Sequence, residues 1–252
     1  MILLVDAGNS RIKWAVLEKG GLHPGGAVPR HGGAEGVDYL ATPWATLPRP
    51  RRLLIANVAG AIFAASFGAW TQRTWGLEAE FVSVQAKGFG VTNGYTEPQR
   101  LGVDRWLALV AARRLVKGSV CVVDCGTALT LDVMERSGEH LGGLIIPGLG
   151  LMRRTLLEKT AGIEPAMGNA PSQDIPQLAQ DTRGGVMRGT LYAAASVIER
   201  VVRDADEAVG GGMTCILTGG DAETLRPLLS ADFRFEPELV LQGLAIVAEA
   251  GP

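Results

Sequence analysis

The chain has 252 residues, of which 47% are hydrophobic, enough for one large domain or two of ordinary size. Its net charge is -2 and its basic residues are scattered, so it lacks the basic surface with which proteins bind nucleic acid. No apolar run approaches the ~18 residues of a membrane span. Cys121, Cys125 and Cys215 lie in or beside expected buried strands, which is typical of reduced thiols in a cytoplasmic protein.

The N-terminal residues predict a strand, a tight turn and a second strand. Residues 2–6 form an apolar strand that ends at Asp6, and apolar positions alternate in the returning strand from Ile12. Glycine amides and polar side chains in such a turn can hold an anion, and Lys13 adds a positive charge. We therefore expect a phosphate loop made by Asp6, Ala7, Gly8, Asn9, Ser10, Arg11, Ile12 and Lys13.

The segment that follows is rich in glycine and proline. Between residues 20 and 52 we expect surface connections around one short helix at 36–46, with little chemistry. A buried strand at 53–56, an apolar-faced helix at 59–75 and a strand from Phe81 come next. This alternation of strand and helix indicates α/β layers.

A polar segment then leads into an apolar helix at 107–116. In this segment Asp104 lies between Gly102, which allows close approach, and Arg105, which can bind a carboxylate or phosphate oxygen. Phosphoryl transfer to an alcohol needs a carboxylate near the acceptor hydroxyl. The alternative is that Asp104 caps a helix at 105–116 and Arg105 is a surface charge, and the two roles can coexist.

The second half repeats the design of the first. A strand at 120–124 is followed by a turn at Gly126 and Thr127 and by strands at 129–135 and 141–146. Asp124 lies 118 residues after Asp6, close to half the chain, which predicts duplicated α/β halves at 1–117 and 118–252. Both acids would repel bare phosphate, so we expect them to hold a metal ion or its waters. Either turn alone is also consistent with an acid that caps its own backbone.

The remaining elements complete the second half. We expect a mobile polar loop at 168–174, and a small-residue face around Tyr192 as a dimer contact. The histidines have no evident partner acid, so we assign them no role. The expected helices and strands lie at 149–158, 183–209, 215–217, 222–229, 233–235 and 239–248, with the turn Thr218-Gly219-Gly220 after the strand at 215–217.

The sequence has neither a P-loop motif nor a dinucleotide-binding glycine motif after its first strand. It resembles instead the superfamily of actin, hexokinase and heat-shock chaperone ATPases. Four blocks are similar, in order and spacing, to the motifs of type III pantothenate kinases. The blocks are the first phosphate loop, Gly102-Val103-Asp104-Arg105, residues 124–132 and residues 142–149.

This resemblance implies two ribonuclease-H-like (actin-like ATPase) domains with a nucleotide cleft between them. It implies phosphorylation of pantothenate by ATP to 4'-phosphopantothenate, the first step of coenzyme A synthesis, by a homodimer that uses Mg²⁺ and a monovalent cation (K⁺ or NH₄⁺). The alternatives are a kinase for another small hydroxylated acceptor, or an ATP-binding regulatory accessory factor without turnover.

The resemblance also implies roles for single residues. Residues 6–13 and Thr127 match ATP contacts, Asp124 the position linked to the monovalent cation, and Asp104 the general base. The glycine turn Thr218-Gly219-Gly220 is expected on the adenosine side. The positions that match substrate contacts are Tyr95, Gly102, Val103, Asp104, Arg105 and Thr182.

Overall fold

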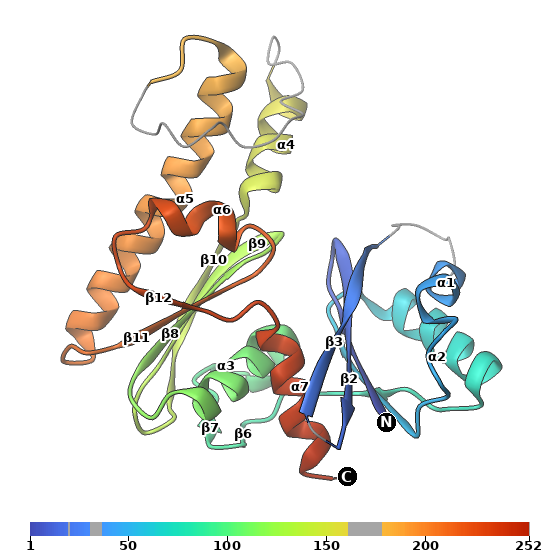
Figure 1. The fold of residues 1–252 in the computed structure, drawn as a ribbon. Coiled ribbons are helices and arrows are strands. Elements are labelled where there is room, and N and C mark those ends of the chain that lie inside the picture. Colours follow the sequence, from blue (N-terminus) through green and yellow to red (C-terminus); the bar gives the residue numbers. More distant parts are fainter. Residues whose placement is uncertain (20, 31–36, 161–177, 252) are drawn as a thin grey trace. The chain divides into compact units, whose positions relative to one another are not determined.

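The computed structural model describes residues 1–19, 21–30, 37–160 and 178–251. It divides into two compact units, one formed by Met1–Leu115 with Glu238–Pro252 and the other by Val116–Pro237 (Figure 1). The polar loop expected at 168–174 lies outside the described residues. In the part of the chain that is described, every helix is too short or too polar to cross a membrane.

The first unit is built on a five-stranded sheet in the order β3-β2-β1-β4-β5. Its strands are β1 (Ile2–Ala7), β2 (Arg11–Glu18), β3 (Gly21–Pro29), β4 (Arg52–Asn57) and β5 (Glu80–Phe81). The first three pair antiparallel, whereas β1 with β4 and β4 with β5 pair parallel. The short strands β6 (Lys87–Gly88) and β7 (Val91–Thr92) form a separate ribbon.

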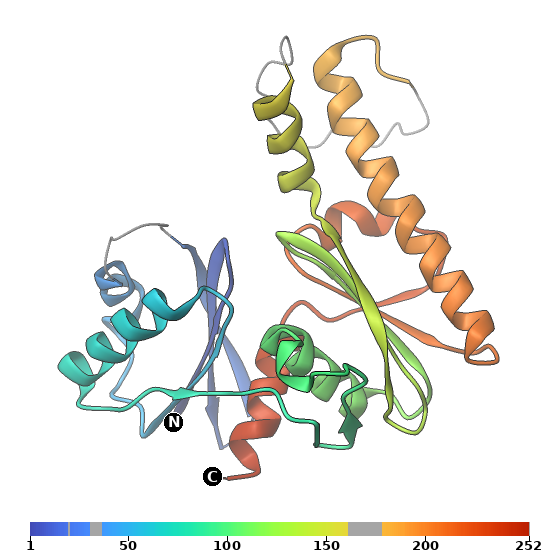
Figure 2. The same ribbon diagram turned by 180° about the vertical axis from the view of Figure 1, so that it is seen from behind.

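Helices cover both faces of this sheet (Figure 2). Leu3, Val5 and Ala7 alternate along β1 and pack in one core with aromatic residues of α1 (Ala41–Trp44) and α2 (Ala61–Trp75). The opposite face carries α3 (Val103–Leu115) and α7 (Leu239–Glu249). Asp6 has the opposite side-chain direction to Val5 and Ala7, so it points to the face of α3 and α7. Lys13, its register partner on β2, points the same way.

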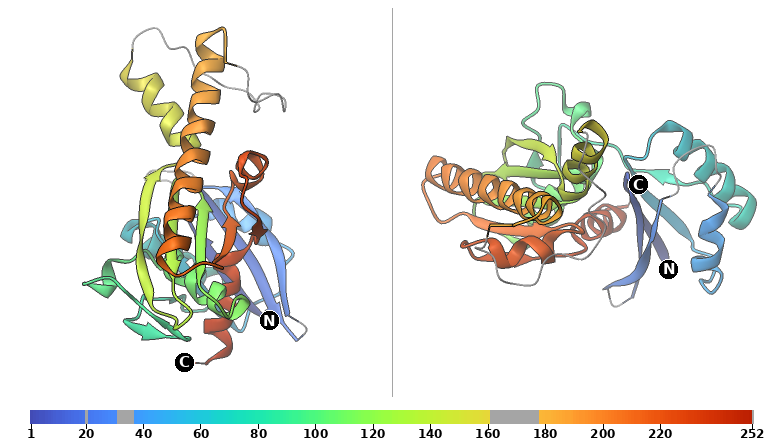
Figure 3. Two further views of the ribbon diagram at one scale, coloured as in Figure 1. Left: turned by 90° about the vertical axis from the view of Figure 1, so that its left-hand side faces the viewer. Right: turned by 90° about the horizontal axis from the view of Figure 1, so that it is seen from above.

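The second unit repeats this sheet, in the order β10-β9-β8-β11-β12 with the same strand directions. Its strands are β8 (Val120–Cys125), β9 (Ala128–Met134), β10 (His140–Pro147), β11 (Thr214–Thr218) and β12 (Phe233–Phe235). The long helix α5 (Thr182–Ala208) packs across β8 and β9 and beside α4 (Leu149–Lys159) (Figure 3). A short helix, α6 (Ala222–Leu225), follows β11. The shared topology confirms the prediction of two similar α/β halves.

Two sequence expectations differ from the structure. The glycine-rich and proline-rich segment expected to be surface connections contains β3, which pairs along the length of β2 because an edge strand tolerates such residues. The C-terminal helix was expected in the second half, yet it belongs to the first unit. It packs so closely on α3 that a β-carbon at Gly243 would lie 2.7 Å from the carbonyl carbon of Leu107.

Candidate active site

The residues predicted to form the first phosphate loop make the turn between β1 and β2. The amide of Gly8 donates to the carbonyl of Arg11 at 3.0 Å, and Asn9 and Ser10 are exposed. The side chains of Ala7 and Ile12 are fully buried in the core, so these two residues can offer a ligand only their backbone.

Charged groups surround this turn. Lys13 Nζ lies 4.0 Å from Oε2 of Glu238, the residue that precedes α7. Arg30, which follows β3, donates from its backbone amide to the Ser10 carbonyl at 2.9 Å and from Nε to the Asn9 carbonyl at 3.0 Å. Sequence reasoning assigned no role to Arg30, because it lies in a segment without a recognised motif.

The residues predicted to form the second phosphate loop make the turn between β8 and β9, and backbone contacts hold this turn on two sides. On one side, the amide of Gly148 donates to the carbonyl of Thr127 at 3.0 Å. On the other, a β-carbon at Gly219 would lie 2.6 Å from the Cys125 amide nitrogen, and the φ of Gly219 is +95°. Only glycine fits there, since it allows both the close approach and the positive φ. The half-buried Asp124 is at the end of β8, beside this contact.

The two loops are anchored by equivalent bonds. In each unit the residue after the third strand, Arg30 or Gly148, donates its amide to the last carbonyl of the turn. In each unit a residue beyond the parallel neighbour strand also donates to the final carbonyl of the first strand. These bonds are Val58 N to Ala7 O at 3.0 Å and Asp221 N to Cys125 O at 2.9 Å. The duplication therefore extends to the way each loop is fixed.

The structure brings four of the predicted substrate residues together in the first unit. Arg105 is 7% exposed, its Nη1 donates to Tyr95 Oη at 2.7 Å, and its Cζ lies 5.5 Å from the centre of the Tyr95 ring. A β-carbon at Gly102 would lie 2.5 Å from Asp104 Oδ1, so the glycine leaves this carboxylate room. Asn93 Oδ1 accepts a bond from the Tyr95 amide at 3.0 Å and fixes the segment.

The helix starts earlier than the sequence predicted. Because α3 begins at Val103, Asp104 lies in its first turn rather than at its N-cap, and Oδ1 accepts from the Arg105 amide at 2.8 Å. Arg105 is buried, which contradicts the alternative of a surface charge. Val103 is also buried, so its side chain belongs to the core.

The other predicted residues lie in the second unit. Thr182 is the exposed first residue of α5, next to Asp181, whose Oδ1 caps the helix by accepting from Gly184 N at 2.7 Å. Asp124, Thr127 and Thr182 are the predicted site residues that belong to this unit, and the remaining predicted residues belong to the first unit.

Sequence reasoning missed a buried pair on β9 and β10. His140 Nε2 lies 2.9 Å from Asp132 Oδ1, and the two residues are 1% and 2% exposed. The pairing of β9 with β10 brings them together, although eight positions separate them in the sequence. Across the described ranges, no group of three or more His, Cys, Asp or Glu side chains is arranged to hold a metal ion.

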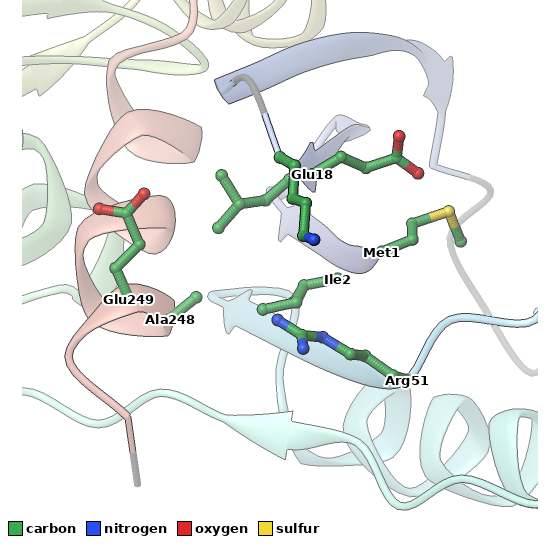
Figure 4. Close-up of a pocket in the computed structure, with 8 residues that line it drawn as sticks. Met1, Ile2, Glu18, Arg51, Ala248 and Glu249 are labelled. Atoms are coloured by element: carbon green, nitrogen blue, oxygen red, sulfur yellow. The ribbon is translucent and has the colours of Figure 1, made fainter.

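A cavity of about 650 Å³ lies elsewhere in the first unit (Figure 4). It is lined by Met1 and Ile2 at the start of β1, by Leu17 and Glu18, and by Arg51 and Glu249, among others. Asp6 lies at the other end of β1, about 15 Å along the strand. None of the predicted site residues lines this cavity.

Comparison with known proteins identifies the family. A sequence model described as type III pantothenate kinase matches residues 2–204. The type III pantothenate kinase of Nitrosococcus oceani is 42% identical over 99% of this chain and 94% of its own length. That of Azoarcus sp. (strain BH72) is 39% identical over 99% of this chain and 91% of its own length. This chain belongs to the type III pantothenate kinase family.

Solved structures agree with this family at the level of the fold. A protein from Campylobacter jejuni that is named as a Baf family transcriptional activator superposes with a TM-score of 0.60 and 20% identity. The match covers 99% of this chain and 98% of that protein. Acetate kinase from Porphyromonas gingivalis superposes with a TM-score of 0.52 and 11% identity, over 98% of both chains. Both therefore share the two-unit α/β fold of this chain.

Proposed function

We propose that this type III pantothenate kinase transfers the γ-phosphoryl group of ATP to the primary hydroxyl of pantothenate, giving 4'-phosphopantothenate and ADP. The observation that carries the proposal is the arrangement of Asp104 on α3. Its carboxylate lies where a β-carbon at Gly102 would crowd it, and the neighbouring Arg105 is buried and bonded to Tyr95. An acceptor that carries both a hydroxyl and a carboxylate requires two groups of the protein. A positioned carboxylate accepts the hydroxyl proton, and a fixed cation beside it binds the carboxylate of the acceptor.

Asp104 acts as the general base in this proposal. It accepts the hydroxyl proton as the acceptor oxygen attacks phosphorus. Arg105 is pre-oriented by its 2.7 Å bond to Tyr95, so less side-chain freedom is lost when its guanidinium binds the substrate carboxylate. Tyr95 and Thr182 supply further hydroxyl contacts to the substrate.

ATP is bound by the two loops. In the first loop, the backbone from Asp6 to Lys13 and the positive charges of Arg11 and Lys13 hold phosphate oxygens. In the second loop, Thr127 offers an exposed hydroxyl. The glycine turn after β11 is assigned to the adenosine side.

The donor atoms fit the expected metal ions. Mg²⁺ in phosphoryl-transfer sites is held by one or two carboxylates together with substrate phosphates, and Asp6 and Asp124 are the second-last residues of the equivalent strands β1 and β8. Asp124 with backbone carbonyls gives the oxygen ligands that a monovalent cation such as K⁺ takes. When bound, these ions neutralise charge on the phosphates.

We further propose a homodimer formed through β10 and its neighbours. β10 is an edge strand with three exposed apolar side chains, Leu141, Leu144 and Ile145. Leu151 and Leu156 on α4, a helix that contacts β10, and Tyr192 on α5, which contacts α4, are exposed as well. β3 occupies the equivalent edge of the first sheet and contains prolines, which discourage pairing. Exposed apolar side chains on β10, in contrast to the prolines of β3, support binding of a partner chain at β10.

The substitution Ile145→Asp tests the dimer. The Ile145 side chain is 63% exposed, so a monomer would tolerate an aspartate there. In a dimer the same aspartate would bury a charge in the interface. Sedimentation analysis should show a shift from dimer to monomer. The matched control is Ile62→Asp on α2, where the side chain is 79% exposed and lies outside this surface. An unchanged dimer in the Ile145 variant would contradict the proposed interface.

The catalytic proposal is tested with Asp104→Asn, which keeps the shape of the side chain. We expect phosphopantothenate formation to fall by about 10²- to 10⁴-fold, while ATP affinity measured by calorimetry stays the same. Asp38→Asn, which removes an exposed carboxylate of the same unit, serves as the control and should retain full activity. Full activity of the Asp104 variant would refute the base assignment.

The same assay separates the alternative functions. Transfer to another small alcohol in preference to pantothenate would indicate a kinase with a different acceptor. ATP binding without ADP release in the presence of any acceptor would indicate a regulatory accessory factor.

A further inference from the structure

The first phosphate loop has a support that lies outside the four motif blocks of the sequence. Arg30 follows the edge strand β3 and makes two hydrogen bonds to the turn between β1 and β2. Its amide donates to the Ser10 carbonyl at 2.9 Å, and its Nε donates to the Asn9 carbonyl at 3.0 Å. One residue therefore fixes two consecutive peptide groups of the loop.

The direction of these two carbonyls determines where the loop amides point. The described residues contain no cis peptide bond, so each carbonyl points opposite to the N–H of its own peptide group. The Asn9 carbonyl shares a peptide group with the Ser10 amide, and the Ser10 carbonyl shares one with the Arg11 amide. Since both carbonyls face Arg30, the Ser10 and Arg11 amides face away from it. Backbone amides that are turned away from the protein side of a loop in this way can bind an anion.

The second unit shows why a side chain is needed only in the first. Gly148 is the equivalent of Arg30 and makes the backbone bond alone, to Thr127. The second turn has two residues between its strands, Gly126 and Thr127, whereas the first turn has three residues, 8–10. The longer turn contains one more peptide group that the strands do not hold. That additional group is held by the side chain of Arg30.

We infer that Arg30 is a positioning residue for the kinase reaction: its Nε bond to Asn9 orients the first phosphate loop for ATP. This inference rests on the proposed function, because it assigns the loop to ATP phosphates. Arg30 acts through the loop backbone. Its loss therefore weakens ATP binding and leaves the affinity for the acceptor unchanged.

Two substitutions separate the hydrogen bond from the charge. Arg30→Gln places an amide nitrogen at the same number of bonds from the backbone as Nε, so it keeps a donor for Asn9 and removes the charge. Arg30→Lys keeps the charge but has a methylene at that position. Arg51→Gln is the control, because Arg51 lies beside the start of β1, at the end opposite the loop.

Calorimetric titration with ATP and Mg²⁺, together with separate KM values for ATP and pantothenate, provides the measurements. We expect Arg30→Lys to weaken ATP binding by about three- to tenfold, the effect of one lost hydrogen bond, and Arg30→Gln to stay within about twofold of the original chain. The KM for pantothenate should stay constant in both variants, and Arg51→Gln should match the original chain.

The reverse order, with Arg30→Lys unimpaired and Arg30→Gln weakened, would overturn the inference in favour of a direct charge contact. Equal ATP affinity in all variants would also overturn it. Failure of the proposed function is distinguishable, because the unsubstituted chain would then bind ATP without forming phosphopantothenate.

Discussion

Gly148→Ala perturbs the proposed second phosphate loop at one place, because it adds a single methyl group at a defined contact. Gly148 has φ -71° and ψ 171°, an extended conformation that alanine adopts without strain. The new β-carbon would overlap the carbonyl oxygen of Gly126 and lie 2.7 Å from that of Thr127. Carbon and oxygen normally approach to about 3.3 Å at closest, so the loop must move by roughly 1 Å.

A displacement of this size has a large expected effect on catalysis. Misplacing a reacting group by about 1 Å costs on the order of 100-fold in rate, so we expect kcat/KM for ATP to fall by about that factor. Overpacking should also lower the free energy of unfolding by about 1–3 kcal/mol. Steady-state kinetics with each substrate varied in turn, and urea unfolding, measure the two effects.

Gly150→Ala is the matched control for this variant. It places the same methyl group in the first turn of α4, where the nearest neighbour is the flexible Nη1 of Arg154 at 3.4 Å. Alanine favours helix by up to about 1 kcal/mol over glycine, so this variant should be fully active and at least as stable. If Gly148→Ala keeps its kcat/KM for ATP, the assignment of the second loop to nucleotide phosphate is wrong.

The remaining predictions concern stability and reactivity. Arg52 donates a hydrogen bond to Glu80 that lowers the pKa of this carboxyl group. The pair therefore stabilises the fold above about pH 4.5, and this stabilisation is lost as the pH falls through the lowered pKa. Glu80→Gln should remove that acid dependence, by at most about 1 kcal/mol because Glu80 is 42% exposed, and an unchanged acid unfolding curve would contradict the argument. Trp44→Ala should cost about 3–5 kcal/mol in urea unfolding, because Trp44 is 2% exposed and packs against four aromatic rings. Trp44→Phe should cost less, since it also removes a buried indole N–H that makes no hydrogen bond among the described residues. Burial raises the pKa of Cys215 to about 11 and that of Cys121 further, so a thiol reagent at pH 8 should modify them only as the chain unfolds; rapid modification of the folded protein would refute their burial.

Local patterns in the sequence predicted the strands and turns of the site. An apolar run that ends in an acid and a glycine is a local signal, and both copies of it form the expected hairpins. The repeat at an offset of 118 residues also predicts the third strand of the first sheet. It maps His140–Pro147, the strand β10, onto residues 22–29, and β3 occupies Gly21–Pro29. The composition of this segment favoured a loop. A strand forms there nevertheless, because an edge strand needs little β-propensity of its own.

Contacts between residues distant in the sequence could not be predicted in this way. The bond from Arg30 to Asn9 spans 21 positions, and it forms because β3 returns beside β2. The pair of His140 and Asp132 depends on the register of β9 and β10. The C-terminal helix joins the first unit through a close glycine contact with α3, which no local pattern encodes.

By itself, the sequence determined the α/β class, the duplication, the two turns and the residues that resemble a type III pantothenate kinase. These depend on periodicity, glycine placement and motif spacing, which are properties of short segments. Only the tertiary structure decided how each turn is held, that Arg105 is buried against Tyr95, and that Arg30 supports the first loop. Such contacts are set by strand register and helix packing, so they exist only once the sheet has formed.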